Sequence, residues 1–229
     1  MDRFPFTSVG FDLDGTLLDT SADLGLALNH VLARNGRPQI PLDEMPGLIG
    51  GGARMLLERG LARTGGLPPR DELPGLQQEL IGFYRANIAH HTRPFPGTEA
   101  SLDALAERGV TLAVVTNKME ELAVAVLDAV GLAPRFATII GGDTLGPGHS
   151  KPAPDLLLEM LRRVGPGPCA YVGDTSYDTR AAAAAGLPCI AVSFGFNDEP
   201  VHGLGAAAVI DHFDALVPAL VGLGAAASV

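Results

Sequence analysis

The sequence predicts an α/β protein in which a doubly wound parallel sheet carries a smaller, all-helical inserted domain. Three observations support this fold class. Short apolar runs of strand length alternate with helical patterns along most of the chain, which is the order of a parallel sheet covered by helices. One long segment near the N-terminus contains helical patterns only. The length of 229 residues suits one sheet domain with one insertion.

Six apolar runs are the expected strands of the sheet, since each is bounded by turn-forming residues or by a helical pattern. They are residues 8–13, 112–116, 137–140, 170–172, 190–192 and 207–210. The expected helices between them are residues 98–108, 119–130, 154–164 and 179–185. Pro154 stands at the start of the third helix and Gly186 at the end of the fourth, which are common positions for these residue types.

The segment of residues 18–94 interrupts this alternation. It contains three amphipathic helical patterns and no convincing strand, at residues 22–34, 53–64 and 72–90. We therefore expect a helical domain at 18–94, inserted into a core formed by residues 1–17 and 95–229. The proline-rich residues 93–97 are expected to act as a stiff hinge at its exit.

The composition restricts the classes of function. Sixteen Lys and Arg against 26 Asp and Glu give a net charge of −10, which argues against nucleic acid or an anionic membrane surface as a partner. Any anionic ligand must be held locally. We expect a cytoplasmic protein, because the polar residues begin too early for a secretory segment. Cys169 and Cys189 each open an apolar run, which suits reduced thiols in the core.

The first expected strand ends in two carboxylates, Asp12 and Asp14. Residues two apart on a strand face the same way, so the two form a like-charge pair that is costly unless a cation or a proton is shared. This arrangement suits Mg²⁺. A helix cap or an Asp14–Gly15 turn would explain either carboxylate alone, but it gives no reason for both.

Two further strand ends carry groups that suit an anion. Thr116, Asn117 and Lys118 lie between a strand and a helix, where a hydroxyl and backbone N–H groups form an anion site, although a plain turn is the alternative. Lys151 precedes a helix that starts at a proline. Lys118 and Lys151 are the chain's two lysines beside 14 arginines, which suggests that a compact point charge is needed at these positions.

A fourth strand ends in Asp174, with Asp178 four residues later. A helix N-cap would explain this pair if it stood alone. Four such strand ends together indicate a ligand, because open α/β sheets bind their ligands at the carboxyl edge of the strands. Oxygen ligands, a threonine, a lysine and a helix N-terminus together predict a magnesium-dependent phosphoryl site.

These segments also resemble a known family. Residues 11–17, 115–117, 151–152 and 173–174 with Asp178 are similar, in this order, to the four motifs of the haloacid dehalogenase superfamily of phosphatases. The resemblance covers nearly the whole chain and implies a Rossmann-like core with the helical insertion as a cap domain. Residues 84–86, 92–97, 116–118 and 194–197 most resemble the bacterial phosphoglycolate phosphatases within this superfamily.

The resemblance implies roles for the strand-end residues. Asp12 is expected to be the nucleophile, and Asp14 the acid and base whose backbone carbonyl also contributes to the metal shell. Lys151 and Thr116 are expected to hold the phosphoryl group, with Asn117 and Lys118 beside the substrate. The expected magnesium ligands are Asp12, Asp14, Asp174 and, directly, through water or as a supporting residue, Asp178.

Substrate choice is expected to come from the cap. Its glycine-rich turn contains Gly51 and Gly52 and is followed by Arg54, which could clamp a carboxylate; a solvated surface arginine is the alternative. Gly51 stands where we expect a polar residue, and Tyr177 stands where many relatives have a small polar one. These two departures concern the choice of substrate and leave the hydrolytic chemistry unchanged.

The expected function is Mg²⁺-dependent hydrolysis of a small phosphomonoester through an aspartyl-phosphate, with 2-phosphoglycolate as the first candidate. The alternatives are a phosphatase for another small sugar phosphate, a phosphosugar mutase, and a phosphate-binding regulator without activity. A dehalogenase is disfavoured because it needs neither a metal nor a second carboxylate such as Asp14. The expected partner is a small anionic substrate, and the expected assembly is a monomer or a homodimer.

Overall fold

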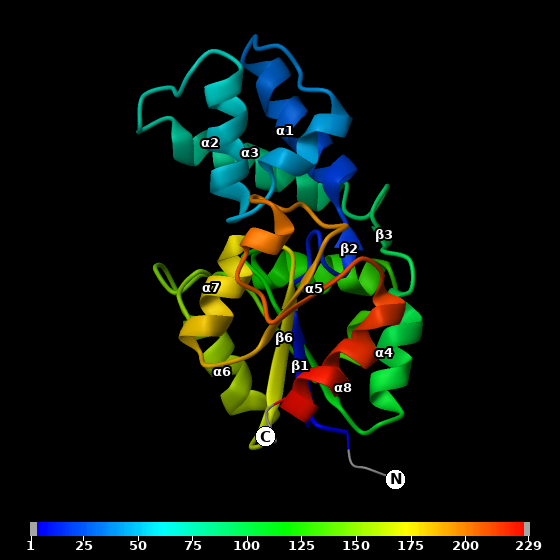
Figure 1. Ribbon diagram of the computed structural model, residues 1–229. Helices are drawn as coiled ribbons and strands as arrows, with labels where there is room; N and C mark the ends of the chain where they lie inside the picture. The colour runs from blue at the N-terminus through cyan, green and yellow to red at the C-terminus, as the bar shows by residue number, and fades with distance from the viewer. Residues whose placement is uncertain (1–3, 227–229) are drawn as a thin grey trace.

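The computed structural model describes residues 4–226, and its core is a six-stranded parallel sheet (Figure 1). The strand order is β5-β4-β1-β6-β7-β8. The strands are β1 (Ser8–Phe11), β4 (Thr111–Val115), β5 (Thr138–Ile140), β6 (Cys169–Gly173), β7 (Cys189–Val192) and β8 (Ala208–Ile210). Strand order reverses at β1, which pairs with β4 on one side and β6 on the other, so the switch point of the sheet lies beside β1.

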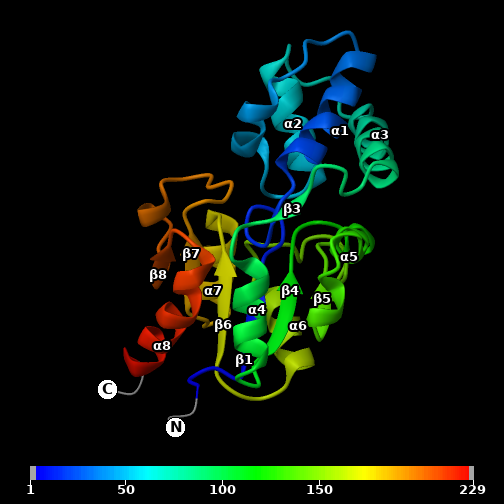
Figure 2. The same ribbon diagram turned by 90° about the vertical axis from the view of Figure 1, so that its right-hand side faces the viewer.

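Helices cover both faces of this sheet (Figure 2). One face packs against α4 (Thr98–Ala106), α5 (Glu120–Ala129) and α8 (Leu216–Ala226), and the other against α6 (Asp155–Val164) and α7 (Ser176–Ala184). Neighbouring strand residues alternate between the two hydrophobic clusters, as the period of two in a strand requires. Val114 belongs to the first cluster and Val115 to the second. The predicted doubly wound fold is confirmed.

Two helices of the core differ from the prediction. α7 begins at Ser176, three residues before the predicted start, because Thr175 and Asp178 form a capping box at its N-terminus. No helix is predicted from the sequence at residues 216–226, where α8 forms. Its Leu216 and Leu220 are fully buried in the first hydrophobic cluster, and this packing stabilises a segment that has no polar face to show helical periodicity.

The insertion is helical, as predicted. It contains α1 (Ser21–Arg34), a 3-10 helix η1 (Leu42–Leu48), α2 (Ala53–Arg63) and α3 (Leu73–Ala86). These helices share their own hydrophobic cluster, in which Leu28, Leu32, Met45 and Leu57 are fully buried. Figure 2 shows the helices above the carboxyl edge of the sheet. The short distance along the chain from β1 to α1 places them there.

The insertion differs from the prediction at its ends. Residues 18–94 were expected to contain no strand, but β2 (Leu18–Asp19) and β3 (Arg93–Pro94) pair antiparallel at the base of the insertion. Strands of two residues are too short to produce an alternating pattern in the sequence. α3 ends at Ala86 instead of residue 90, because the Asn87 amide donates to the Phe83 carbonyl and closes the last turn.

The structure also shows where the two cysteines lie and whether a helix could cross a membrane. Cys169 and Cys189 are buried, unpaired thiols at the starts of β6 and β7, as expected. Within residues 4–226, none of the helices has both the length and the apolar composition needed to cross a bilayer.

Candidate active site

The polar strand ends lie together around one cavity of about 250 Å³ between the sheet edge and the helical insertion. Asp12 follows β1, Thr116 follows β4 and Asp174 follows β6, so three adjacent strands deliver them to the same edge. The predicted residues that line the cavity are Asp12, Asp14, Thr116, Asn117, Lys118, Lys151, Asp174 and, from the insertion, Gly51, Gly52 and Arg54. Asp178 lies behind the lining.

Lys151 is the buried centre of this site. Its Nζ lies 2.9 Å from Asp12 Oδ1 and 2.6 Å from Asp178 Oδ1. The ammonium also donates to the Tyr171 hydroxyl and the Val115 carbonyl. Burial alone would lower the pKa of Lys151, but the two carboxylates outweigh it and raise this pKa above its usual range. Lys151 is therefore held as a fixed positive charge beside Asp12.

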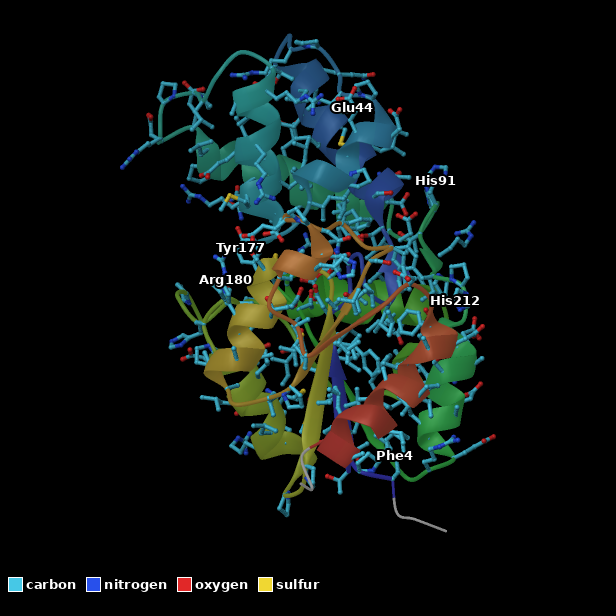
Figure 3. All side chains as sticks on the ribbon, in the orientation of Figure 1. Phe4, Glu44, His91, Tyr177, Arg180 and His212 are labelled. Carbon is cyan, nitrogen blue, oxygen red and sulfur yellow. The ribbon has the colours of Figure 1, made fainter. Side chains whose placement is uncertain are left out.

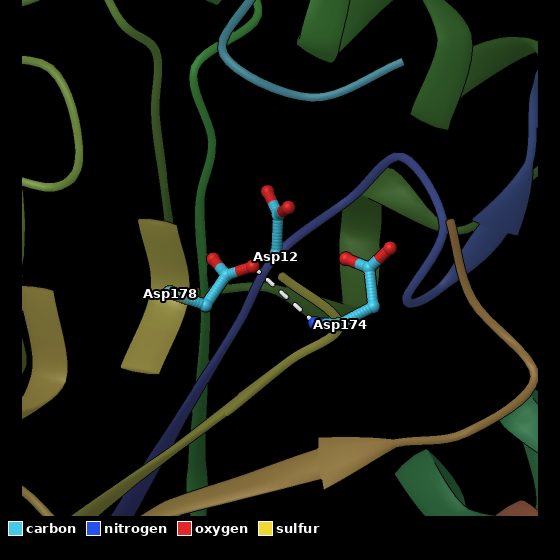
Figure 4. A group of neighbouring side chains, drawn as sticks. All are labelled: Asp12, Asp174 and Asp178. Atoms are coloured by element: carbon cyan, nitrogen blue, oxygen red, sulfur yellow. Dashed lines mark hydrogen bonds between the residues drawn. The ribbon is translucent and has the colours of Figure 1, made fainter. Parts of the chain in front are cut away.

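Asp178 holds the parts of the site together from behind. It is fully buried, and its Oδ1 accepts from Lys151. Its Oδ2 accepts from the Thr175 hydroxyl at 2.7 Å and from the Asp174 backbone N–H at 3.3 Å (Figure 4). A Cβ at Gly173 would lie 2.4 Å from the Asp178 carboxyl carbon, so this glycine allows the close approach. Asp178 thus fixes both Lys151 and the turn that carries Asp174.

Asp174 is oriented by two hydrogen bonds. Its Oδ1 accepts from the Thr16 hydroxyl at 3.0 Å, and its Oδ2 accepts from the Phe196 N–H at 2.7 Å. Gly15 has a φ of +84°, and a Cβ there would lie 2.2 Å from Asp174 Oδ2. A side chain at Gly15 would therefore be strained and would also displace the carboxylate. Burial raises the pKa of Asp174 well above its usual range.

Asp12 has the least satisfied carboxylate of the group. Lys151 approaches its Oδ1 as an ion pair, yet this buried oxygen accepts no hydrogen bond from any described residue. Burial raises the pKa of Asp12 to about 7, the negative charge of Asp178 adds to the effect, and Lys151 opposes it. The site therefore holds a carboxylate that lacks the contacts to support its charge.

The acidic cluster fits a divalent cation. Asp12, Asp174 and Asp178 each offer a ligand oxygen, and these oxygens lie within 4.8 Å of one another. Three carboxylates face one ammonium, so the cluster lacks two positive charges when all are ionised. Carboxylate oxygens are the ligands that Mg²⁺ prefers, and this ion typically uses one or two carboxylates together with waters. The residues present therefore fit Mg²⁺.

Asp14 has a different partner from Asp12. Its two carboxylate oxygens lie 2.9 and 2.8 Å from Lys118 Nζ, and Oδ1 also accepts from the Thr20 hydroxyl at 2.7 Å. From the sequence, the two carboxylates are expected to form a like-charge pair that shares a cation or a proton. In the structure each faces its own lysine, because the turn after Asp12 carries Asp14 toward β4 and Lys118.

The Asn117 side chain hydrogen-bonds to the backbone of Lys151. Its side-chain amide donates to the Lys151 carbonyl, and its side-chain oxygen accepts from the Lys151 N–H, both at 2.9 Å. This double hydrogen bond fixes the loop that carries Lys151. Thr116 lies beside it, and its hydroxyl oxygen accepts from the Lys118 N–H at 3.2 Å. Thr116 and Lys118 therefore reach the cavity from one short turn after β4.

The glycine turn of the insertion touches the core. Gly50, Gly51 and Gly52 all have positive φ, and a Cβ at Gly52 would lie 3.1 Å from the Asn117 carbonyl oxygen. A Cβ at Gly51 would lie 3.2 Å from the Tyr177 ring, which stands at the end of α7 that faces the insertion (Figure 3). The missing side chain at Gly51 therefore leaves the space that the large Tyr177 ring needs.

Arg54 follows this turn in α2 and lines the cavity. Its Nε donates to Glu58 at 2.8 Å, and 60% of the side chain is exposed. Arg54 thus stands at the solvent side of the cavity with a partner one helical turn away.

The sequence analysis missed several residues that shape the site. Thr20, Tyr84 and Tyr171 contact Asp14, Lys118 and Lys151 respectively. Arg59, which donates to the carbonyls of residues 48–50, holds the glycine turn. Tyr84 lies 34 residues from Lys118 and Tyr171 lies 20 residues from Lys151, so no local pattern could have assigned these two roles, whereas Thr20 and Arg59 have partners within 11 residues. The segment 84–86 did carry a signal, since it was part of the family resemblance.

Comparisons with known proteins identify the class to which this site belongs. Residues 9–192 match the family described as haloacid dehalogenase-like hydrolase. The chain is 42% identical over 224 residues to a phosphoglycolate phosphatase of Agrobacterium fabrum, covering 95% of each chain. It is 42% identical over 208 residues to one of Caulobacter vibrioides, covering 90% of this chain and 87% of that one.

A solved structure agrees with these sequence matches. The crystal structure of a predicted phosphoglycolate phosphatase from Haemophilus somnus superposes with a TM-score of 0.86 at 29% identity, covering 93% of this chain and 97% of the other. Fold, site and relatives define a phosphoric monoester hydrolase. The chain belongs to the haloacid dehalogenase-like hydrolases, which confirms the resemblance seen in its motifs.

Proposed function

We propose that the protein hydrolyses 2-phosphoglycolate to glycolate and phosphate, with Mg²⁺ as cofactor and an aspartyl-phosphate at Asp12 as intermediate. The observation that carries the proposal is the cavity itself, in which Asp12 stands between Lys151 and Asp174 beneath the glycine turn of the insertion. Its volume of about 250 Å³ is below the roughly 300–1,000 Å³ of pockets for drug-sized ligands, which suits a small phosphomonoester. The names of the relatives support the choice of 2-phosphoglycolate.

The proposed division of labour follows the three hydrophobic clusters of the chain, two on the faces of the sheet and one in the insertion. Residues 1–17 and 95–229 form the catalytic core, and residues 18–94 form a cap that closes the cavity. The hydrophobic cluster of α1, α2 and α3, which Leu122 and Phe196 of the core join, supports this division, and the paired strands β2 and β3 connect the two parts. A cap of this kind excludes water from the phosphoryl group while the first step proceeds.

In the first proposed step, an oxygen of Asp12 attacks phosphorus, and the bond from phosphorus to the ester oxygen breaks. Lys151 and the Thr116 hydroxyl hold the phosphoryl oxygens. Asp14 donates a proton to the leaving ester oxygen, so that glycolate leaves with a neutral hydroxyl group at that position. Because Asp14 is bonded to Lys118 and Thr20 here, it must exchange one of these contacts for the substrate.

In the second proposed step, water attacks phosphorus of the aspartyl-phosphate. Asp14 takes the proton of this water, the bond between Asp12 and phosphorus breaks, and inorganic phosphate leaves. Asp12 is thereby restored as a carboxylate. The same carboxyl group thus serves as acid and then as base, which requires Asp14 to stay near the phosphorus in both steps.

Asp12 and Asp174 are the proposed direct ligands of Mg²⁺. Bound there, Mg²⁺ offsets the negative charge between the attacking carboxylate and the phosphate ester. The Asp178 oxygens already accept from Lys151, Thr175 and the Asp174 backbone. We therefore assign Asp178 to holding the site and not to direct coordination.

Phosphate release from a panel of phosphomonoesters tests the proposed function. The panel contains 2-phosphoglycolate, 3-phosphoglycerate, glycerol 3-phosphate, glucose 1-phosphate and glucose 6-phosphate. We expect the highest kcat/KM with 2-phosphoglycolate. A higher value for a sugar phosphate would favour a sugar phosphatase, interconversion of the two glucose phosphates would identify a mutase, and no release from any compound would contradict a hydrolase.

Metal binding gives the first prediction. Saturating Mg²⁺ is expected to raise the midpoint of thermal unfolding of the EDTA-treated protein by roughly 5–10 °C, because ligand binding at about 100 times Kd stabilises a chain of this size by that amount. Asp174→Asn is expected to abolish this shift, while the exposed Asp71→Asn keeps it. An unchanged shift in Asp174→Asn, or full activity after EDTA treatment, would remove the proposed metal site.

Arg54 gives the second prediction. We propose that it attracts the substrate carboxylate at the cavity entrance, before the substrate is fully bound, where an exposed charge contributes little. Arg54→Ala is expected to lower kcat/KM for 2-phosphoglycolate by about two- to fivefold. The effect on p-nitrophenyl phosphate should be smaller, and Arg63→Ala, on the same helix but outside the cavity lining, should leave both values unchanged. An equal loss on both substrates would contradict a carboxylate contact.

A further inference from the structure

A buried tyrosine of the insertion lines the cavity, and its hydroxyl has no hydrogen-bond acceptor among the described residues. Tyr84 lies near the end of α3, and only 2% of it is exposed. Its polar neighbour is the Lys118 ammonium, which can only donate, so the proton of the hydroxyl has no acceptor among the described residues, although the ring packs in the hydrophobic cluster of the insertion. Buried hydroxyls are almost always hydrogen-bonded, because losing water without a substitute is costly. Since Tyr84 lines the cavity, a ligand in the cavity can supply the missing partner.

Lys118 stands directly over this tyrosine. Its Nζ lies 4.7 Å from the centre of the Tyr84 ring, and the residue is buried. An ammonium has three N–H donors, and the two oxygens of Asp14 accept two of them. The third N–H donor of Lys118, a core residue, and the hydroxyl of Tyr84, a residue of the insertion, therefore lie in one small region of the cavity wall.

The surroundings make this region selective for an anion. The cavity lining around it contains a set of apolar side chains, namely Leu24, Ile49, Leu56, Leu80, Leu122 and Phe196. In such a setting a polar contact is stronger than in water, and an unpaired polar group is more costly. Two hydrogen-bond donors, one of them a cation, match the two oxygens of a carboxylate.

The other cations of the lining are less suited to this task. Lys151 is already paired with two buried carboxylates, Asp12 and Asp178. Arg54 is mostly exposed and bonded to Glu58. Lys118 is the remaining cation among the described residues that line the cavity, and it is next to an unpartnered donor.

We infer that Tyr84 and Lys118 form a carboxylate subsite that selects phosphomonoesters with a carboxylate one carbon away from the ester oxygen. The inference rests on the proposed function, in which Asp14 protonates that oxygen. Because Lys118 is bonded to Asp14, a group held by Lys118 lies close to the proton donor. A short leaving group such as glycolate can therefore place its ester oxygen at Asp14 and its carboxylate at Lys118.

The contacts beside Tyr84 connect this selection to the position of the insertion. The next residue, Arg85, pairs with Glu121 of α5 at 3.0 Å. On the other side of the cavity the turn at Gly52 meets the Asn117 carbonyl. Tyr84 thus reaches the subsite when the insertion rests on the core. A carboxylate that bonds both Tyr84 and Lys118 would stabilise this arrangement.

The test compares two substrates that differ in the carboxylate, 2-phosphoglycolate and 2-hydroxyethyl phosphate. Tyr84→Phe removes the hydroxyl and keeps the ring. It is expected to lower kcat/KM for 2-phosphoglycolate by roughly 10- to 100-fold, mainly through KM, because a hydrogen bond to a charged group is lost. The kcat/KM for 2-hydroxyethyl phosphate should change by no more than about twofold, because this substrate has no carboxylate for the subsite to bind. Tyr177→Phe is the matched control and should change both substrates by the same factor.

An inhibitor pair separates the subsite from the proposed substrate. 3-Phosphonopropionate, which keeps the spacing of 2-phosphoglycolate, and ethylphosphonate also differ in a carboxylate, and both can be measured as inhibitors of p-nitrophenyl phosphate hydrolysis. Tyr84→Phe should weaken inhibition by 3-phosphonopropionate about tenfold or more and leave inhibition by ethylphosphonate unchanged. Equal effects on both inhibitors would overturn the subsite. Failure of the wild-type protein to prefer 2-phosphoglycolate over 2-hydroxyethyl phosphate, with the inhibitor difference intact, would overturn the proposed substrate and support the subsite.

Discussion

Asp12→Asn is expected to lower kcat on the order of 10⁴- to 10⁶-fold, the range found when a catalytic nucleophile is removed. The amide has nearly the shape of the carboxylate, but it cannot attack phosphorus and form an aspartyl-phosphate. The loss should appear with 2-phosphoglycolate and with an activated aryl phosphate alike, because both need the same nucleophile. Steady-state phosphate release measures it, and Asp71→Asn at an exposed turn is the matched control.

The same substitution is expected not to lower stability in the absence of divalent cations. Burial raises the pKa of Asp12 to about 7, so above that pH its ionised form costs folding free energy that asparagine does not. Lys151 keeps its ion pair with Asp178 at 2.6 Å in the variant. The midpoint of thermal unfolding in EDTA should therefore be equal to that of the wild type or higher.

Two results would contradict the role of Asp12. One is turnover within about tenfold of the wild type. The other is the absence of an adduct at Asp12 when the wild-type protein is treated with beryllofluoride, which mimics a phosphoryl group on a carboxylate. An inactive variant with a strongly reduced unfolding midpoint would instead show that Asp12 supports the fold, against the electrostatic argument above.

The sequence predicts the core of this protein well because its signals are local. Apolar runs such as residues 112–116 and 190–192 coincide with strands, since strand burial on both faces requires continuous apolar sequence. The order of these strands and helices then places Asp12, Thr116 and Asp174 at one edge of the sheet. For these residues, position along the chain nearly determines position in space.

The rest of the site could not be predicted because it depends on contacts between distant residues. Asp12 and Asp14 look like one pair in the sequence, yet 104 residues separate Asp14 from its partner Lys118. Tyr84 lies in an ordinary amphipathic helix, and nothing in that pattern shows that it lines the cavity beside Lys118. The fold brings these partners together, whereas the local pattern only places each on its own element.

The second large effect is expected at Lys151. Lys151→Ala should lower kcat/KM by about 10²- to 10³-fold through lost stabilisation of the phosphoryl charge. It should also lower the free energy of unfolding by about 3–5 kcal/mol, because Asp12 and Asp178 lose a buried counter-charge. Lys151→Arg is not expected to restore activity, since a planar guanidinium cannot replace a point charge that makes four close contacts in a filled space.

A double substitution separates the two effects of Lys151. In Lys151→Ala/Asp178→Asn one of the uncompensated carboxylates is neutral, so part of the lost stability should return, as measured by urea unfolding. Activity should stay as low as in Lys151→Ala, because the charge next to Asp12 is still missing. If the double variant regained both stability and turnover, Lys151 would act by supporting the fold. If it regained neither, repulsion among the buried carboxylates would not be the cause of the instability.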